Sequence, residues 1–114
     1  MSEVLELTKQ CLNSKNAEDI IVFDMHEVSP IVDYYVVCSA ETERKMQAIT
    51  NELVKLAKEN KITVKSVEGK ESADWILVDL GDVVVHILKT SDREKYDFEK
   101  LWNEVPQIKL KEEI

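Results

Sequence analysis

Residues 75–89, WILVDLGDVVVHILK, place two aspartates and a histidine inside one apolar segment. Carboxylate and imidazole groups can ligate a metal or act as an acid–base pair, so Asp79, Asp82 and His86 are the first candidates for chemistry. These residue types also have structural uses, because aspartate is common in tight turns and a strand histidine can pack in the interior. No Ser-His-Asp or Cys-His arrangement can be read from the spacing, and catalysis is the weakest interpretation of this segment.

Asp24 and His26 form a second pairing that could add to the same set of metal ligands or proton carriers. His26 fits a loop residue equally well. Nucleotide chemistry is poorly supported, because the chain has only two glycines, Gly69 and Gly81, and lacks a G-x-G-x-x-G motif, a P-loop and a nucleophile elbow. We therefore predict no catalytic residue, no metal site and no cofactor.

A β-hairpin is the element that positions the first set of candidates. The pair Gly81-Asp82 is a two-residue turn signal, which sets Leu80 opposite Val83. Because side chains alternate along a strand, one face of the hairpin is wholly apolar and holds Ile76, Val78, Leu80, Val83, Val85 and Ile87. The other face is mixed and holds Trp75, Leu77, Asp79, Val84, His86 and Leu88. The apolar face must be buried, most simply beneath a helix over residues 42–60.

Two interpretations of the mixed face remain open from the sequence. In the first, the face lies under another helix, Trp75 and Leu88 belong to the core, and Asp79 pairs with its diagonal neighbour His86. In the second, the face is partly open, and Trp75 with Leu77 forms a protein-binding patch, since tryptophan is enriched at interface hot spots.

The remaining pattern predicts alternating helices and strands. Apolar spacing predicts helices and strands at residues 2–15 (helix), 19–25 and 33–40 (strands), 42–60 (helix), 62–67 (strand), and 91–105 (helix, with Ser91 and Glu94 as a capping box). This order predicts an α/β (α+β) fold, with one domain over residues 1–105 and a mixed sheet of about five strands flanked by helices. The tail at residues 106–114 is short and charged, and we expect it to fray or to contact a partner.

Composition limits the classes of partner. The formal net charge of -8 repels phosphate backbones, so direct nucleic-acid binding is disfavoured, whereas an acidic surface suits a basic protein. We expect no membrane span and no signal peptide, and therefore a cytoplasmic protein. Cys11 and Cys38 are isolated in the sequence and are predicted to be small buried hydrophobic residues.

Three blocks, DYYVVCSAETERKMQAI, EGKESADWILVDLGDVVVHIL and REKYDFEKLW, together resemble the ribosomal silencing factor family, also called RsfS or Iojap. The resemblance implies a nucleotidyltransferase-like topology without the catalytic motif, and a factor that is not an enzyme. It also implies binding to the large ribosomal subunit through ribosomal protein number fourteen, which is basic. The bound factor would sterically block joining of the small subunit and repress translation in starvation or stationary phase. Homodimers occur in the family.

The resemblance also implies site residues. The family's contact surface centres on the tryptophan strand, and the partner-binding residues that it implies here are Trp75, Leu77, Asp79, Tyr35 and His86. Tyr34 and Arg93 match family positions as well, although Arg93 could equally hold the capping turn. Two alternatives from other classes remain: a nucleotidyltransferase-like enzyme, and a homodimeric scaffold that uses the same patch for self-association.

Overall fold

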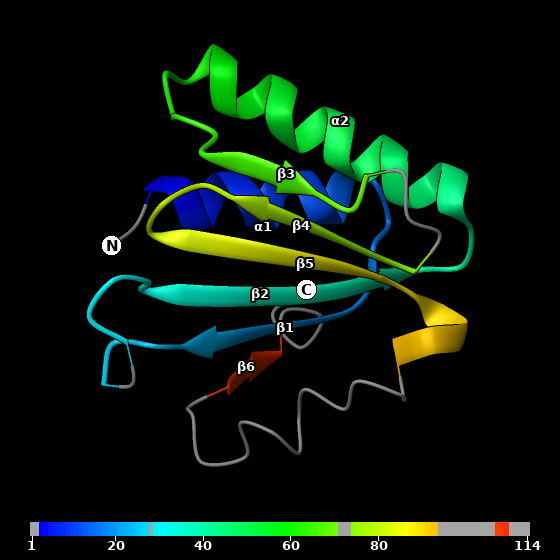
Figure 1. Ribbon diagram of the computed structural model, residues 1–114, viewed down its shortest axis with the longest axis horizontal. Coiled ribbons are helices and arrows are strands. Elements are labelled where there is room, and N and C mark those ends of the chain that lie inside the picture. The colour runs from blue at the N-terminus through cyan, green and yellow to red at the C-terminus, as the bar shows by residue number, and fades with distance from the viewer. Residues whose placement is uncertain (1–2, 28, 71–73, 94–106, 110–114) are drawn as a thin grey trace.

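The centre of the molecule is a six-stranded mixed sheet, shown in Figure 1 with its strands running across the view. This computed structural model describes residues 3–27, 29–70, 74–93 and 107–109. The elements in chain order are α1 (Glu3–Ser14), β1 (Glu18–Asp24), β2 (Tyr34–Ala40), α2 (Glu43–Glu59), β3 (Ser66–Glu68), β4 (Trp75–Asp79), β5 (Val83–Lys89), the 3₁₀ turn η1 (Thr90–Asp92) and β6 (Gln107–Lys109). The strand order in the sheet is β3-β4-β5-β2-β1-β6. Strands β2 and β5 are parallel, and every other neighbouring pair is antiparallel. The predicted α+β class with a mixed sheet is confirmed.

The β4–β5 hairpin has the register that the turn signal predicted. Trp75 pairs with Leu88, and Asp79 pairs with Val84. The turn is closed by a Leu80 amide that donates to the Val83 carbonyl, with 2.9 Å between nitrogen and oxygen. Since the register is correct, the division of the hairpin into an apolar face and a mixed face is also correct.

Within the described residues, both helices pack on the apolar face of the sheet. In α2, Met46, Ile49, Leu53 and Ala57 recur at helical spacing and are fully buried. They join a core cluster with the apolar hairpin residues and with Leu5, Cys11 and Leu12 of α1. The prediction that this face lies beneath the helix at 42–60 is confirmed. Cys11 and Cys38 are buried, as predicted, and burial raises the pKa of their thiols to about 11 and about 12.

The third strand begins later than the predicted range of 62–67, because the end of α2 uses the first of those residues. The Lys61 amide donates to the Lys58 carbonyl, and the Ile62 amide donates to the Ala57 carbonyl at 2.8 Å. Lys61 has a φ of 60°, so the chain ends the helix in a Schellman motif. Ile62 therefore belongs to the helix cap, and pairing with β4 starts only at Ser66.

The C-terminal part of the chain adds an edge strand that the sequence pattern did not reveal. β6 lies within the segment 106–114 and pairs antiparallel with β1, with Ile108 opposite Val22. The predicted helix at 91–105 lies mostly outside the described residues, apart from the turn η1 and the residue after it. Among the described residues, no helix is both long enough and apolar enough to cross a bilayer.

Gly69 lies against the first residue of β4. Its φ is +76°, and a Cβ built on it would collide with the backbone carbonyl oxygen of Trp75. Gly81 also has a positive φ, +92°, but the nearest atom to its Cβ position is the Lys65 Cε, at 3.7 Å. The two glycines share a conformational requirement and differ in the space around them.

We expect Gly69→Ala to lower the free energy of unfolding by about 3 kcal/mol or more, because backbone strain and overpacking add. Gly81→Ala should cost only the backbone term, about 1 to 2 kcal/mol. Urea unfolding of both variants measures the difference. Equal losses would show that the contact with the Trp75 carbonyl relaxes without cost.

Candidate functional site

The five residues predicted to bind a partner lie together on the sheet face opposite the helices. Three side-by-side rows cross β4, β5 and β2, according to the strand registers: Trp75, Leu88 and Ser39; Leu77, His86 and Val37; Asp79, Val84 and Tyr35. We call the surface formed by Trp75, Leu77, Asp79, His86 and Tyr35 the aromatic face. The sheet therefore brings all five predicted residues onto one surface.

The centre of the aromatic face is a hydrogen bond between Trp75 and His86. The indole Nε1 donates to the His86 Nδ1 at 3.1 Å, and the two ring centroids lie 5.6 Å apart. The Tyr35 ring also packs edge-on against the imidazole, with centroids 5.1 Å apart. An indole N–H can only donate, so Nδ1 is the acceptor and the neutral imidazole carries its proton on Nε2.

The predicted pairing of Asp79 with His86 is wrong. The Asp79 carboxylate turns toward its own hairpin, and its Oδ1 accepts the Gly81 amide at 2.8 Å. This local bond stabilises the turn in the way that aspartate commonly does. Trp75 and Asp79 are the two diagonal neighbours of His86 across the hairpin, and the twist of the sheet makes the two diagonals unequal.

Burial keeps His86 neutral. Its side chain is 6% exposed, and desolvation lowers the pKa of the imidazole to about 4. The ring is therefore uncharged at neutral pH, which suits its role as acceptor for the indole. It is poorly placed to exchange protons near neutral pH.

The mixed face is partly core, as the first interpretation predicted for Leu88, and partly open, as the second predicted for Trp75 and Leu77. A second core cluster occupies its interior and comprises Ile21, Phe23, Met25, Val37 and Leu88. Trp75 and Tyr35 pack against this cluster and are half-buried, as are Leu77 and Asp79. The aromatic face thus consists of a buried histidine at its centre and four half-buried side chains around it.

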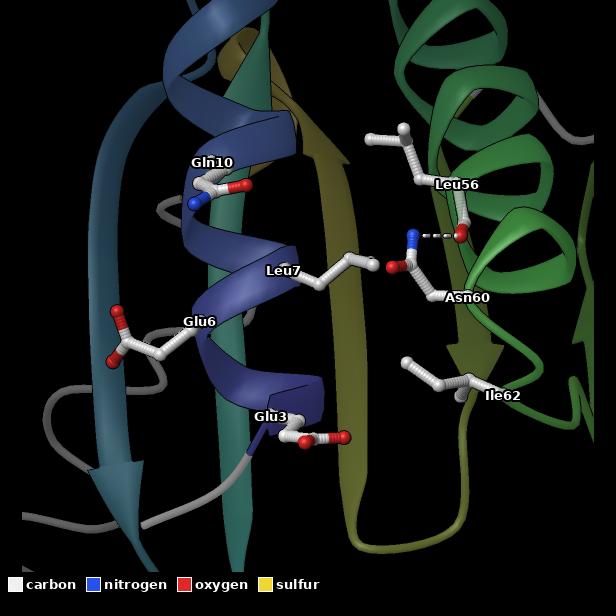
Figure 2. Close-up of a pocket in the computed structure, with 7 residues that line it drawn as sticks. All are labelled: Glu3, Glu6, Leu7, Gln10, Leu56, Asn60 and Ile62. Atoms are coloured by element: carbon white, nitrogen blue, oxygen red, sulfur yellow. Dashed lines mark hydrogen bonds between the residues drawn. The ribbon is translucent and has the colours of Figure 1, made fainter.

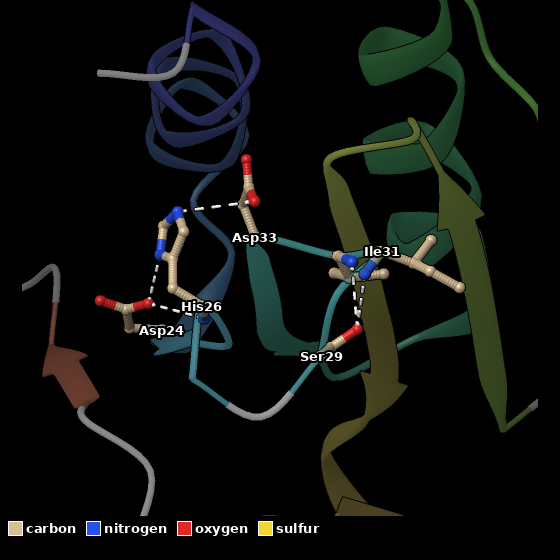
Figure 3. A network of polar contacts seen from close by, with 6 residues as sticks. Asp24, His26, Ser29, Ile31 and Asp33 are labelled. Carbon is tan, nitrogen blue, oxygen red and sulfur yellow. Dashed lines mark hydrogen bonds and ion pairs between the residues drawn. The ribbon is translucent and has the colours of Figure 1, made fainter.

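The Asp24–His26 pair belongs to a separate network at the β1–β2 connection, shown in Figure 3. The His26 Nδ1 contacts the Asp24 Oδ1, and its Nε2 lies 3.5 Å from the Asp33 Oδ1. The side-chain hydrogen bond to Asp24 raises the pKa of His26, and the hydrogen bond from the His26 amide lowers the pKa of Asp24. The Tyr34 ring packs edge-on against the imidazole, with centroids 5.1 Å apart. This arrangement ties the end of β1 to the start of β2.

Ser29 stabilises another part of the connection between β1 and β2. The Ser29 Oγ accepts the amides of Ile31 and Val32 at 3.2 and 3.1 Å, which shapes the loop around them. The described part of the chain contains no group of three or more His, Cys, Asp or Glu side chains placed to hold a metal ion. The contacts of His26 stabilise the loop between β1 and β2.

Arg93 holds a corner of the sheet. It is buried, and its guanidinium donates to the Asp19 carbonyl at 2.6 Å and to the Ser39 Oγ at 3.3 Å. Asp19 has a φ of 48° and lies where the register between β1 and β2 shifts. These contacts give Arg93 a structural role at the β1–β2 corner, a different place from the capping turn that the sequence suggested.

The fold and this arrangement define a small α+β protein with an aromatic surface on one sheet face. A family model described as "Ribosomal silencing factor during starvation" matches residues 1–114. The chain is 41% identical over 108 residues to the Ribosomal silencing factor RsfS of Halalkalibacterium halodurans, covering 95% of this chain and 92% of that protein. It is 42% identical over 107 residues to RsfS of Bacillus subtilis, covering 94% and 91%. The chain belongs to the ribosomal silencing factor family.

A solved structure agrees with this assignment. A crystal structure of a protein from Bacillus halodurans is similar with a TM-score of 0.83 and 39% sequence identity. The similarity covers 94% of this chain and 97% of that chain. The fold described above is therefore also seen in an experimentally solved relative.

We expect His86 to make stability depend on pH. The folded-state pKa of about 4 lies below the ordinary value of 6.5 for histidine, so the unfolded chain binds a proton in this window that the folded chain does not. Stability is then fully present above about 6.5 and falls as the pH drops toward about 4. At 1.36 kcal/mol per pKa unit, the loss reaches about 3 kcal/mol.

The measurement is urea unfolding of the wild type and of His86→Gln across this pH range. The difference in unfolding free energy between the two should shrink as the pH falls. His26→Gln is the matched control, because the raised pKa of His26 gives its contribution the opposite sign. A His86→Gln difference that stays constant with pH would contradict a buried neutral imidazole.

Proposed function

We propose that this chain is a cytoplasmic regulatory protein, and not an enzyme, that represses translation in starvation or stationary phase. It binds the large ribosomal subunit through ribosomal protein number fourteen and sterically blocks joining of the small subunit. Membership of the family supports this proposal, because the curated relatives are named ribosomal silencing factors. The aromatic face is the surface that we propose for the contact.

The observation that carries this assignment is the hydrogen bonding and partial exposure of Trp75. Its indole N–H is already bonded to His86, and its ring is half-buried on a central part of the sheet. The exposed part of the ring therefore offers apolar area without an unsatisfied polar group, which is the chemistry of an interface hot spot. Half-buried Leu77 and Tyr35 extend the apolar area on neighbouring positions of the same face.

Charge favours a basic partner for this surface. The chain carries a formal net charge of -8, and half-buried Asp79 lies on the aromatic face itself. Complementary charge speeds association and disfavours acidic competitors. A ribosomal protein rich in lysine and arginine meets this requirement, while the apolar contact around Trp75 supplies most of the affinity.

We expect Trp75→Glu and Leu77→Glu to weaken binding to isolated large subunits about thirtyfold or more, the effect of losing a hot spot. Ala48→Glu is the matched control, because Ala48 is exposed on α2 and the substitution adds the same charge away from the sheet. Cosedimentation measures binding, and gradient sedimentation with added small subunits measures joining. The two hot-spot variants should also lose the block on joining.

The outcomes separate the alternatives. If Trp75→Glu folds and binds large subunits as the wild type does, the aromatic face is not the contact surface. If Trp75→Glu instead breaks a homodimer while leaving ribosome binding unchanged, the face is a self-association surface. Magnesium-dependent nucleotide turnover by the wild type would favour the nucleotidyltransferase-like enzyme.

A further inference from the structure

A groove lies between α1 and α2, on the side of the molecule opposite the aromatic face. It has a volume of about 400 Å³ and is lined by Glu3, Glu6, Leu7, Gln10, Leu56, Asn60 and Ile62. Figure 2 shows α1 along one side of the groove and the end of α2 along the other. The proposed ribosomal contact uses none of these residues.

The cap of α2 builds one wall of the groove. In a Schellman motif the residue after the left-handed position folds back toward the last turn of the helix, and here the Ile62 amide donates to the Ala57 carbonyl. Figure 2 shows Leu56, Asn60 and Ile62 one after another along this side of the groove. Leu7 projects toward this wall from α1. The side chains of Leu7, Leu56 and Ile62 pack against the main core cluster and are half-buried, so only the part of each that stays exposed lines the groove.

Among the polar residues that line the groove, Asn60 and Glu3 offer hydrogen-bond acceptors. The Asn60 Nδ2 donates to the Leu56 carbonyl at 2.8 Å, which turns the Asn60 Oδ1 toward Leu7. The exposed Glu3 carboxylate lies below it in the same view. Glu6 points away from the groove and pairs with Lys9 at 3.5 Å. An occupant must therefore combine apolar side chains with hydrogen-bond donors.

We propose that this groove docks a basic amphipathic segment of a partner protein. Its apolar side chains lie between Leu7, Leu56 and Ile62, and a lysine or arginine reaches Glu3 and the Asn60 Oδ1. Amphipathic helices commonly bind in apolar grooves of this kind. The formal net charge of -8 on the chain also favours a basic occupant over an acidic one. The docking site goes beyond the proposed function, and a partner could occupy it while the aromatic face is engaged.

The test uses a synthetic peptide with leucine on one helical face and lysine on the other, and a scrambled peptide of the same composition. Fluorescence anisotropy of the labelled peptides measures binding to the full chain. Glu3→Lys should weaken binding of the amphipathic peptide about tenfold, since it places like charge at the contact. Glu43→Lys is the matched control, because Glu43 is exposed in the first turn of the other helix. It should change binding less than about twofold.

A second pair of variants tests the apolar wall. Leu56→Ala removes a half-buried side chain from the groove, and Val54→Ala removes one of similar exposure from the same helix outside it. Only Leu56→Ala should weaken the peptide, by about fivefold to tenfold for the lost apolar contact. Circular dichroism confirms that both variants are folded.

Three results would overturn the proposal. Equal binding of the scrambled peptide, or equal weakening by Glu3→Lys and Glu43→Lys, would mean attraction to net charge alone. Loss of binding in Trp75→Glu but not in Glu3→Lys would place the peptide on the aromatic face. Sedimentation of the wild type as a dimer that Leu56→Ala dissociates would make a second copy the occupant.

Discussion

The central position of β5 is the constraint on which the rest of the structure depends. Its side chains from Val83 to Leu88 are all buried, although they alternate between the two faces of the sheet. Such a strand must be covered on both sides and paired on both edges. Its apolar face attaches to the helices, and its other face brings His86 between Leu77 of β4 and Val37 of β2. The pairing of the strands therefore brings the residues of the aromatic face together.

A buried histidine at that position requires a partner for its ring nitrogens, because an unsatisfied polar group in the interior is costly. The Trp75 indole satisfies Nδ1. The same bond fixes the orientation of the tryptophan, so the histidine stabilises the fold and prepares the surface at once. This dual role explains why a residue type often found in catalytic sites lies here with a pKa lowered to about 4.

The sequence predicted those parts of the fold that depend on local periodicity. The hairpin register followed from a two-residue turn, and both described helices followed from apolar spacing. The prediction was wrong for the partner of His86, because the hairpin register alone does not distinguish its two diagonal neighbours. Asp79 and Trp75 are both diagonal to His86, and only sheet twist separates them. The sequence prediction was also wrong at Ile62. The alternating pattern assigned this residue to a strand, but it belongs to the C-terminal cap of α2. The edge strand β6 has three residues, too few for a periodic pattern.

The chain contains only two histidines, and their environments shift their pKa values in opposite directions for opposite reasons. His86 is enclosed by aromatic rings, where burial disfavours the charged form. His26 is exposed between two carboxylates, where the charged form is favoured. At neutral pH the imidazole at the centre of the aromatic face is therefore uncharged, whereas the His26 imidazole keeps its proton to a higher pH than an ordinary histidine. The hydrogen bond from the Trp75 indole to the neutral His86 ring therefore persists at neutral pH, which suits the contact that we propose around Trp75.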